Sequence, residues 1–262
     1  MSGQIMSLIR LLRLLCRGVT AFIWTIFVYG CMVRIPQIFY RNKPYPKAHS
    51  IWGKGLAWIM GIKIHKKNER PELMGDMIIS NHLGFLDVPI MLSLYPGVFA
   101  IKEEMKNVFF FGQALVKQGH IFVKRDDKFS KRKALVELMK VLKKNNRVII
   151  FPEGKASPGA ERLPFNPGSF LAAKKLDKTV EICVIDYLPD RSLLAWDVNK
   201  KTIPQLADLF GRKKIDVSVE FFEPVRIEEK PAEFAQKWHD IIQNRLEQND
   251  RDREKNGSKV HE

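Results

Sequence analysis

His82 and Asp87, separated by four residues, lie in the stretch of the chain with the clearest potential for chemistry. The apolar run Met77 to Ile79 is short enough for a buried strand and ends at Ser80-Asn81. Asp87, with Pro89 after it, is typical of a helix start. A turn between strand and helix would bring the carboxylate to the imidazole, hold one ring nitrogen protonated and leave the other free to accept a proton. The alternative interpretation is a loop histidine and a plain helix cap.

Two further stretches place charged residues at the ends of predicted strands. Residues 119–125 form one strand that is closed by Lys124 and Arg125, a pair suited to holding a phosphate. A solvated basic edge is the alternative. Residues 147–151 form a buried strand that stops at Pro152, which cannot donate to a sheet, and Gly154, which permits an unusual turn. Glu153 is thereby placed at a strand end, where α/β enzymes keep their sites.

The elements that position these residues alternate between strands and helices, which predicts an α/β fold. We expect a mixed, largely parallel sheet flanked by helices, with an N-terminal membrane-associated helical segment. The segment 186–204 is polar and rich in turn residues. The predicted strands are 62–66, 77–79, 98–101, 119–125, 147–151, 180–185 and 215–221, and the predicted helices are 50–61, 88–94, 109–116, 130–144 and 234–246.

Composition limits the possible partners. The 262 residues carry 44 Lys and Arg against 29 Asp and Glu, a net charge of +15 that favours nucleic acid, a membrane surface or a phosphorylated substrate. The 3 cysteines are far apart, so neither a disulfide framework nor a metal site is expected, and a reducing compartment is indicated. No Gly-rich nucleotide loop or cluster of metal ligands stands out, so we expect no metal and no cofactor.

The amino terminus reads as a membrane-associated segment. Residues 5–17 place Arg10, Arg13 and Arg17 on one face of a helix and leucines on the rest, as in an interfacial helix. The uncharged stretch 18–33 is shorter than the roughly 20 residues that span a bilayer upright. A monotopic or re-entrant helical pair is therefore favoured over a span or a buried core helix. A cleaved signal peptide is not favoured, because no small-residue cleavage site ends the apolar region.

Three regions follow from these patterns. Residues 1–48 are expected to hold the membrane-associated helices and a proline-containing connector, residues 49–246 a catalytic domain, and residues 247–262 a disordered polar tail.

The three motifs together resemble a known family. Asn81-His82-x4-Asp87, Gly119-x-x-Phe122-Val123-x-Arg125 and Phe151-Pro152-Glu153-Gly154 occur in the order seen in the PlsC-like glycerolipid acyltransferases, whose members include lysophosphatidate acyltransferases. The resemblance covers roughly residues 50 to 226. It implies transfer of a fatty acyl group from acyl-CoA or acyl-ACP, as co-substrate, to the free hydroxyl of lysophosphatidate, in phospholipid biosynthesis.

The resemblance also implies roles for individual residues. His82 is the base and Asp87 orients it, and backbone N–H groups near Asn81 to Gly84 are candidate donors to the oxyanion. The substrate-binding residues implied are Asn81, Lys102, Gly119, Phe122, Lys124, Arg125, Glu153 and Gly154, with Arg125 foremost for the acceptor phosphate. The implied partners are a membrane lipid surface, a lysophospholipid acceptor and the acyl donor, and the implied location is the cytoplasmic face of the inner membrane.

The chain departs from the family pattern in two places. Lys155 replaces the hydroxyl residue that commonly follows Phe-Pro-Glu-Gly, and residues 180–185 contain no proline where a Val-Pro step is usual. Both departures leave the acyltransfer residues in place and bear on the acceptor. Lyso-ornithine lipid or a lysophosphatidylcholine-type lipid is therefore the alternative acceptor. A basic nucleic-acid-binding protein is a rival from another class, but it would leave His82, Asp87 and Glu153 as coincidences, and no nucleic-acid motif is present.

Overall fold

The computed structural model describes residues 2–35, 46–69, 74–108, 111–124, 127–157, 163–197 and 199–258. The expected connector after residue 35 lies outside these ranges for most of its length. The helical elements are α1 (Ser2–Val28), η1 (Tyr29–Arg34), α3 (Pro46–Met60), α4 (Asp87–Leu94), η2 (Glu103–Asn107), α5 (Phe111–Lys117), α6 (Lys128–Lys143), α7 (Gly168–Lys175), η3 (Arg191–Leu193), α8 (Thr202–Gly211) and α9 (Pro231–Ser258). The strands are β1 (Ile62–Lys66), β2 (Met77–Ser80), β3 (Val98–Lys102), β4 (Ile121–Val123), β5 (Val148–Ile150), β6 (Val180–Leu188) and β7 (Ile215–Val225).

The strands form one seven-stranded sheet in the order β1-β7-β6-β2-β5-β3-β4. All neighbouring pairs are parallel except β6 and β7, which pair antiparallel. The predicted mixed, largely parallel α/β sheet is therefore confirmed. Because β2, β5, β3 and β4 are parallel neighbours, their carboxyl ends lie side by side, and so do the residues that follow these ends.

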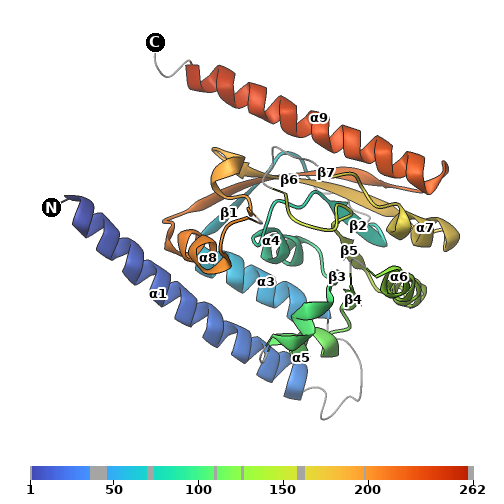
Figure 1. Ribbon diagram of the computed structural model, residues 1–262, viewed down its shortest axis with the longest axis horizontal. Coiled ribbons are helices and arrows are strands. Elements are labelled where there is room, and N and C mark those ends of the chain that lie inside the picture. The colour runs from blue at the N-terminus through green and yellow to red at the C-terminus, as the bar shows by residue number, and fades with distance from the viewer. Residues whose placement is uncertain are drawn as a thin grey trace.

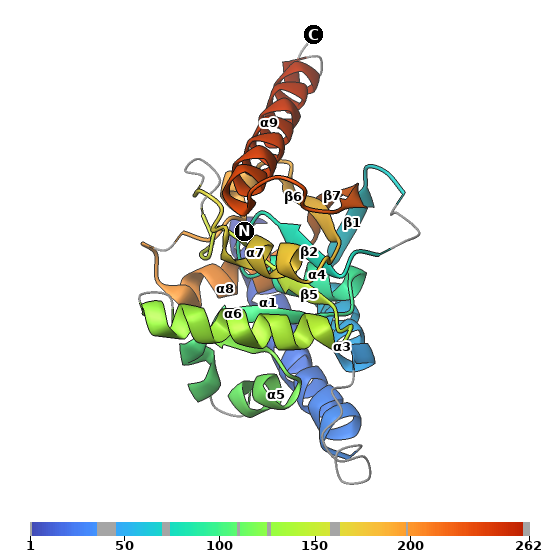
Figure 2. The same cartoon turned by 90° about the vertical axis from the view of Figure 1, so that its right-hand side faces the viewer.

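Alternating residues of the central strands divide the core between the two faces of the sheet. Ile78 packs in one cluster with α3, α4 and α8, whereas Met77 and Ile79 pack in the other with α6, α7 and α9. The helices α1 and α9 accordingly lie on opposite sides of the sheet (Figure 1). Figure 2 shows α6 and α7 together over the part of the sheet that contains β5.

The amino terminus forms one long helix instead of the predicted pair. The helix α1 continues from Ser2 through Gly18 to Val28 and passes into η1, so no turn separates the arginine-bearing part from the apolar part. The segment Leu8–Met32 is long and apolar enough to cross a membrane by length and composition. Many of its apolar side chains, including those of Leu12 and Leu15, are exposed. This apolar helix is consistent with membrane association.

The three arginines of α1 contact α8 and the residues that follow it. Arg13 donates to the carbonyl oxygen of Gly211 at 2.9 Å, and Arg17 donates to that of Lys213 at 3.2 Å. Arg10 pairs with Asp208. Cations near the last carbonyl groups of a helix are stabilising there, so the basic face of α1 caps the C-terminal end of α8. Sequence patterning did not predict α8 itself.

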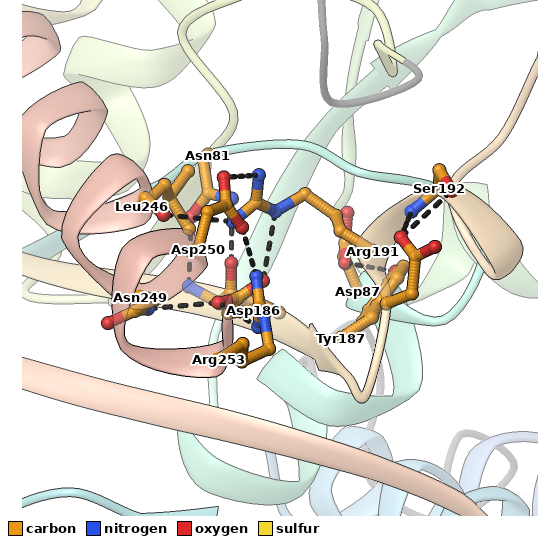
Figure 3. A network of polar contacts seen from close by, with 12 residues as sticks. Asn81, Asp87, Asp186, Tyr187, Arg191, Ser192, Leu246, Asn249, Asp250 and Arg253 are labelled. Atoms are coloured by element: carbon orange, nitrogen blue, oxygen red, sulfur yellow. Dashed lines mark hydrogen bonds and ion pairs between the residues drawn. The ribbon is translucent and has the colours of Figure 1, made fainter. Parts of the chain in front are cut away.

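The polar tail that we expected to be disordered from Glu247 is instead helical as far as Ser258, so that expectation is wrong for these residues. Composition alone favoured disorder, but buried ion pairs hold this part of α9. Asn249 and Arg253 each donate to Oδ2 of Asp186 at 2.9 Å (Figure 3). Asp186 is 1 % exposed and lies on β6, so the tail is anchored to the centre of the sheet.

Candidate active site

The predicted pairing of His82 with Asp87 is present. Nδ1 of His82 lies 2.8 Å from Oδ2 of Asp87, and the carboxylate is fully buried while the imidazole is 16 % exposed. A carboxylate at Nδ1 favours the tautomer in which that nitrogen carries the proton. Among the described residues, none hydrogen-bonds Nε2 of His82. The free nitrogen is thus available as a proton acceptor.

Asp87 is not a simple helix cap. It is the first residue of α4, and its Oδ2 accepts hydrogen bonds from the backbone N–H groups of Leu83 (2.6 Å) and Gly84 (2.8 Å). The carboxylate therefore organises the turn that carries the histidine. Gly84 is needed at this turn for space, because a Cβ there would lie 3.1 Å from the backbone nitrogen of Trp196.

Phe151 supports the imidazole from one side. The two rings are stacked, with centroids 4.2 Å apart and planes at 9°, and Phe99 stacks on Phe151 in turn at 5.5 Å. Offset stacking of this kind restrains rotation of the imidazole ring. The first residue of the Phe-Pro-Glu-Gly motif thus contacts the histidine of the first motif.

The segment 151–157 wraps around His82. Oε1 of Glu153 accepts from the backbone N–H of His82 at 3.1 Å, and the N–H of Ser157 donates to the His82 carbonyl oxygen at 3.0 Å. Gly154 adopts φ +77°, the left-handed conformation that glycine tolerates best. Glu153 therefore fixes the histidine backbone, a contact that the sequence did not predict.

A small pocket lies between this turn and α9. Glu153 and Ser157 contribute polar groups to it. Its lining residues are Asn81, Leu83, Glu153, Ser157, Phe165, His239, Ile242, Gln243 and Leu246.

Asn81 has a structural role. Its Nδ2 donates to the carbonyl oxygen of Ile185 at 2.8 Å, and its Oδ1 accepts from the N–H of Ile185 at 2.9 Å. The side chain is 3 % exposed and extends the pairing of β2 with β6 beyond the end of β2. Because both ends of the amide are engaged with the backbone, we no longer assign Asn81 to substrate binding.

The backbone donors that we considered for the oxyanion are engaged elsewhere. The N–H of His82 donates to Glu153, and those of Leu83 and Gly84 donate to Asp87. These three N–H groups stabilise the turn between His82 and Asp87. Our expectation that they face a tetrahedral intermediate is therefore not supported.

The described cations among the predicted site residues, like His82, lie at the carboxyl ends of parallel strands. Lys102 ends β3 and lies 3.6 Å from Glu104 with an exposed side chain, and Lys124 directly follows β4 and is exposed. Arg125 lies outside the described residues. Phe122, on β4, contacts the ammonium group of Lys106 at 4.7 Å, and Gly119 adopts φ +79° before that strand. Lys102 and Lys124 therefore lie at the carboxyl ends of two neighbouring parallel strands, and their part in substrate binding stays a prediction.

Tyr187 was missed by sequence reasoning. Its hydroxyl donates to Oδ1 of Asp87 at 2.5 Å, and the residue is fully buried. Burial, followed by the charge of Asp87, raises the pKa of Tyr187 well above its usual value, so the hydroxyl stays protonated. A residue 100 positions away from Asp87 gives no local signal of this contact. Only the pairing of β6 beside β2 creates it.

Trp196 was noted only as part of a polar loop. Its backbone N–H donates to the carbonyl oxygen of Leu83 at 2.7 Å. The loop after β6 thus contacts the turn between His82 and Asp87. Among the described residues no group of three or more His, Cys, Asp or Glu is placed to hold a metal ion.

Comparison with known proteins gives a consistent result. The model of the Acyltransferase family matches residues 61–186. The matched range includes His82 and Asp87 and ends one residue before Tyr187. A 1-acyl-sn-glycerol-3-phosphate acyltransferase of Helicobacter pylori is 32% identical over 116 residues, which are 42% of this chain and 47% of that protein. The lyso-ornithine lipid O-acyltransferase of Brucella abortus is 24% identical over 75% of this chain and 74% of its own length.

Solved structures show the same fold. The crystal structure of the 1-acyl-sn-glycerophosphate acyltransferase PlsC from Thermotoga maritima superposes with a TM-score of 0.62 at 21% identity, covering 91% of this chain and 97% of that one. The matched region spans about half the length of the Helicobacter relative and about three quarters of the Brucella relative.

Proposed function

This chain belongs to the acyltransferase family, and on that basis we propose that it transfers a fatty acyl group from an acyl thioester to the free hydroxyl of lysophosphatidate. The product is phosphatidate, and the reaction is a step of phospholipid biosynthesis. The observation that carries the proposal is the pairing of a buried Asp87 with Nδ1 of a partly exposed His82, which leaves Nε2 free.

In the first step His82 acts as general base. An alcohol is a weak nucleophile at neutral pH, so Nε2 removes the hydroxyl proton of the acceptor as its oxygen attacks the thioester carbonyl carbon. Asp87 stabilises the imidazolium that forms. No protein nucleophile takes part, because the acceptor oxygen forms the new ester bond directly.

In the second step the tetrahedral intermediate collapses. The carbon–sulfur bond breaks, the carbonyl re-forms, and the sulfur leaves with the electron pair of that bond. The imidazolium of His82 returns its proton to the leaving thiolate, which restores the neutral base and releases a free thiol. Atoms and charge balance without a cofactor.

Cations at the carboxyl ends of the strands bind the acceptor phosphate. Lys102 is the last residue of β3 and Lys124 follows β4, and these strands lie two and three strand positions from β2. With strands about 4.8 Å apart, these ends are roughly 10 to 14 Å from the end of β2. That spacing leaves room for a glycerol unit between the base and long cationic side chains, of which Arg125 is the foremost candidate.

A lipid surface supplies the acceptor. The exposed apolar face of α1 holds the enzyme at the cytoplasmic face of the cell membrane, where a lysophospholipid and its product reside. Acyl-CoA or acyl carrier protein delivers the acyl group from the aqueous side. Gly119, Phe122, Glu153 and Gly154 shape the neighbourhood of the acceptor in this proposal.

A second acceptor is suggested by one of the relatives. The lyso-ornithine lipid O-acyltransferase of Brucella matches 75% of this chain at 24% identity. The two departures from the family pattern, Lys155 and the absence of proline from residues 180–185, also bear on the acceptor. Lyso-ornithine lipid is therefore the alternative acceptor for the same chemistry.

The test is thiol release from oleoyl-CoA by the full chain in mixed micelles, with lysophosphatidate, lyso-ornithine lipid or lysophosphatidylcholine as acceptor. We expect lysophosphatidate-dependent release that His82→Ala abolishes. His65→Ala is the matched control, because His65 also pairs with an aspartate, Asp216 at 2.6 Å, but lies on β1 at the far edge of the sheet. Release with lyso-ornithine lipid alone would select the second acceptor. If no thiol were released with any acceptor, either from oleoyl-CoA or from oleoyl-acyl carrier protein, the reaction class would be contradicted.

A further inference from the structure

Each oxygen of the Asp87 carboxylate has its own set of donors. Oδ2 receives His82 and two backbone N–H groups, whereas the hydroxyl of Tyr187 is the one side-chain donor to Oδ1 among the described residues. Rotation of the carboxylate about its Cβ–Cγ bond moves both oxygens, so the donors at Oδ1 and at Oδ2 oppose that rotation together. The Tyr187 hydroxyl therefore completes the restraint on the group that orients the base.

The hydroxyl of Tyr187 interacts with both the carboxylate and the backbone of Asp87. Tyr187 is fully buried in the apolar cluster that contains Leu86 and Ile90, where phenylalanine would fill nearly the same volume. A buried hydroxyl costs about 1–3 kcal/mol unless it is hydrogen-bonded. Its bond of 2.5 Å to Asp87 removes that cost and directs the donor at the catalytic pair.

The backbone that carries Tyr187 is fixed on both sides. The preceding residue, Asp186, points to the opposite face of the sheet and accepts from Nε of Arg191 at 2.9 Å as well as from two residues of α9. Arg191 in turn pairs with Asp250 at 3.1 Å. Figure 3 shows this cluster around β6, with Tyr187 directed away from it toward Asp87.

On the other side, Ile185 is held by the amide of Asn81, and Tyr187 itself pairs with Val217 of β7. Three consecutive residues of β6 thus have independent anchors. The position of the tyrosine hydroxyl is consequently as rigid as the centre of the sheet. This rigidity is what an orienting group requires, because a misplacement of about 1 Å can cost roughly 100-fold in rate.

We propose that Tyr187 is a positioning residue of the acyltransfer reaction, which holds Oδ1 of Asp87 so that Oδ2 faces Nδ1 of His82. It touches no substrate and acts through the aspartate. The inference rests on the proposed function for its kinetic consequence, but the geometry of the Tyr187–Asp87–His82 chain can be tested without any turnover. Glu153, which contacts the backbone of His82, is the other titratable group in contact with the pair among the described residues.

The test compares Tyr187→Phe with Tyr95→Phe. Both tyrosines are fully buried, and Tyr95 donates one comparable hydrogen bond, to the carbonyl oxygen of Gly75 at 2.6 Å, away from the catalytic pair. We expect Tyr187→Phe to lower kcat about tenfold, with KM for both substrates within about twofold of the unchanged enzyme. The acid limb of its pH–rate profile should move to higher pH, because Asp87 loses a donor that competes with the imidazolium. Tyr95→Phe should change none of these.

A spectroscopic arm is independent of activity. The proton between Nδ1 of His82 and Asp87 should give a downfield proton NMR signal that His82→Ala removes. We expect Tyr187→Phe to shift or broaden that signal and Tyr95→Phe to leave it unchanged. An unaltered signal together with unaltered kcat in Tyr187→Phe would overturn the proposal, as would equal effects of both variants. An altered signal in a protein without acyltransfer would retain the positioning role and reject the proposed function.

Discussion

The imidazole of His82 lies flat on the ring of Phe151, with 9° between the ring planes and 4.2 Å between their centroids. The two residues come from different motifs, one after β2 and one after β5, and the strands are neighbours in the sheet. The contact explains why an aromatic residue precedes Pro-Glu-Gly in this chain. Phe151 thus covers one face of the histidine that we propose as the general base.

Replacing Phe151 by leucine should slow the reaction without unfolding the protein. Stacked aromatic pairs contribute about 0.5–1.5 kcal/mol beyond area burial, so we expect a loss of roughly 2- to 10-fold in kcat as the imidazole becomes less restrained. Steady-state kinetics with the preferred acceptor measures it. Phe129→Leu is the control, because Phe129 is exposed on α6 and should leave kcat unchanged. Equal kcat in both variants would remove Phe151 from the positioning of the base.

Replacing Asn81 by alanine should destabilise the fold. The substitution leaves the N–H and carbonyl groups of Ile185 without their side-chain partner in a buried position. Each such group costs about 1–3 kcal/mol, so for the two groups we expect the free energy of unfolding to fall by about 2–6 kcal/mol. Urea unfolding followed by circular dichroism measures it.

The control for this variant is Asn244→Ala, since Asn244 is exposed on α9 and should change stability by less than about 0.5 kcal/mol. If Asn81→Ala were as stable as that control but bound acceptor weakly, the original assignment of Asn81 to substrate binding would be restored.

The sequence predicted those parts of the site that are local in the chain. His82 and Asp87 are separated by one turn, and strand ends at Lys102, Lys124 and Glu153 follow from the alternation of strands and helices. Tyr187 could not be predicted, because its contact with Asp87 depends on which strand lies beside β2. The order β7-β6-β2 places β6 there, and no periodicity encodes strand order.

The same limit explains the error at the carboxy terminus. The composition from Glu247 onward is that of a disordered segment, and hydrophobic patterning gives no reason to extend the helix. Charge patterning could have contributed, because Asp250 and Arg253 are spaced to lie on one helical face. What fixes them is Asp186 together with Arg191, and both of these are distant in sequence.

Truncation after Leu246 should therefore be costly. It removes Asn249, Asp250 and Arg253, leaving the buried Asp186 with Arg191 alone and Arg191 without its outer carboxylate. Removing a partner from a buried ion pair typically costs about 3–5 kcal/mol, and we expect a loss of that order in the free energy of unfolding. A chain that ends after Lys255 keeps the cluster and is the control. If both truncated proteins unfolded at the same urea concentration as the full chain, the tail would be dispensable and the original expectation correct.

Acid should destabilise the protein through two buried histidines, His49 and His120, whose rings lie 4.8 Å apart. Burial lowers the pKa of His49 from 6.5 to about 4, and burial followed by the charge of His49 lowers the pKa of His120 well below 6.5. Between pH 6.5 and about 4 the unfolded chain binds protons at these sites that the folded chain does not. The free energy of unfolding therefore falls as the pH is lowered, by up to about 1.4 kcal/mol per pH unit for each histidine.

The His49→Gln variant isolates one of these groups. Wild-type protein should lose about 2 kcal/mol more than His49→Gln between pH 7.5 and pH 5, measured as the change in urea unfolding free energy at each pH. The paired carboxylates Asp76 and Asp250 have lowered pKa values, so they lose their contribution only below about pH 4 and do not obscure this window. Asn244→Ala, at an exposed residue that does not titrate, should keep the wild-type pH dependence. If His49→Gln also kept the wild-type pH dependence, the pKa of His49 would be the same in the folded and unfolded chains. Burial would then not lower that pKa.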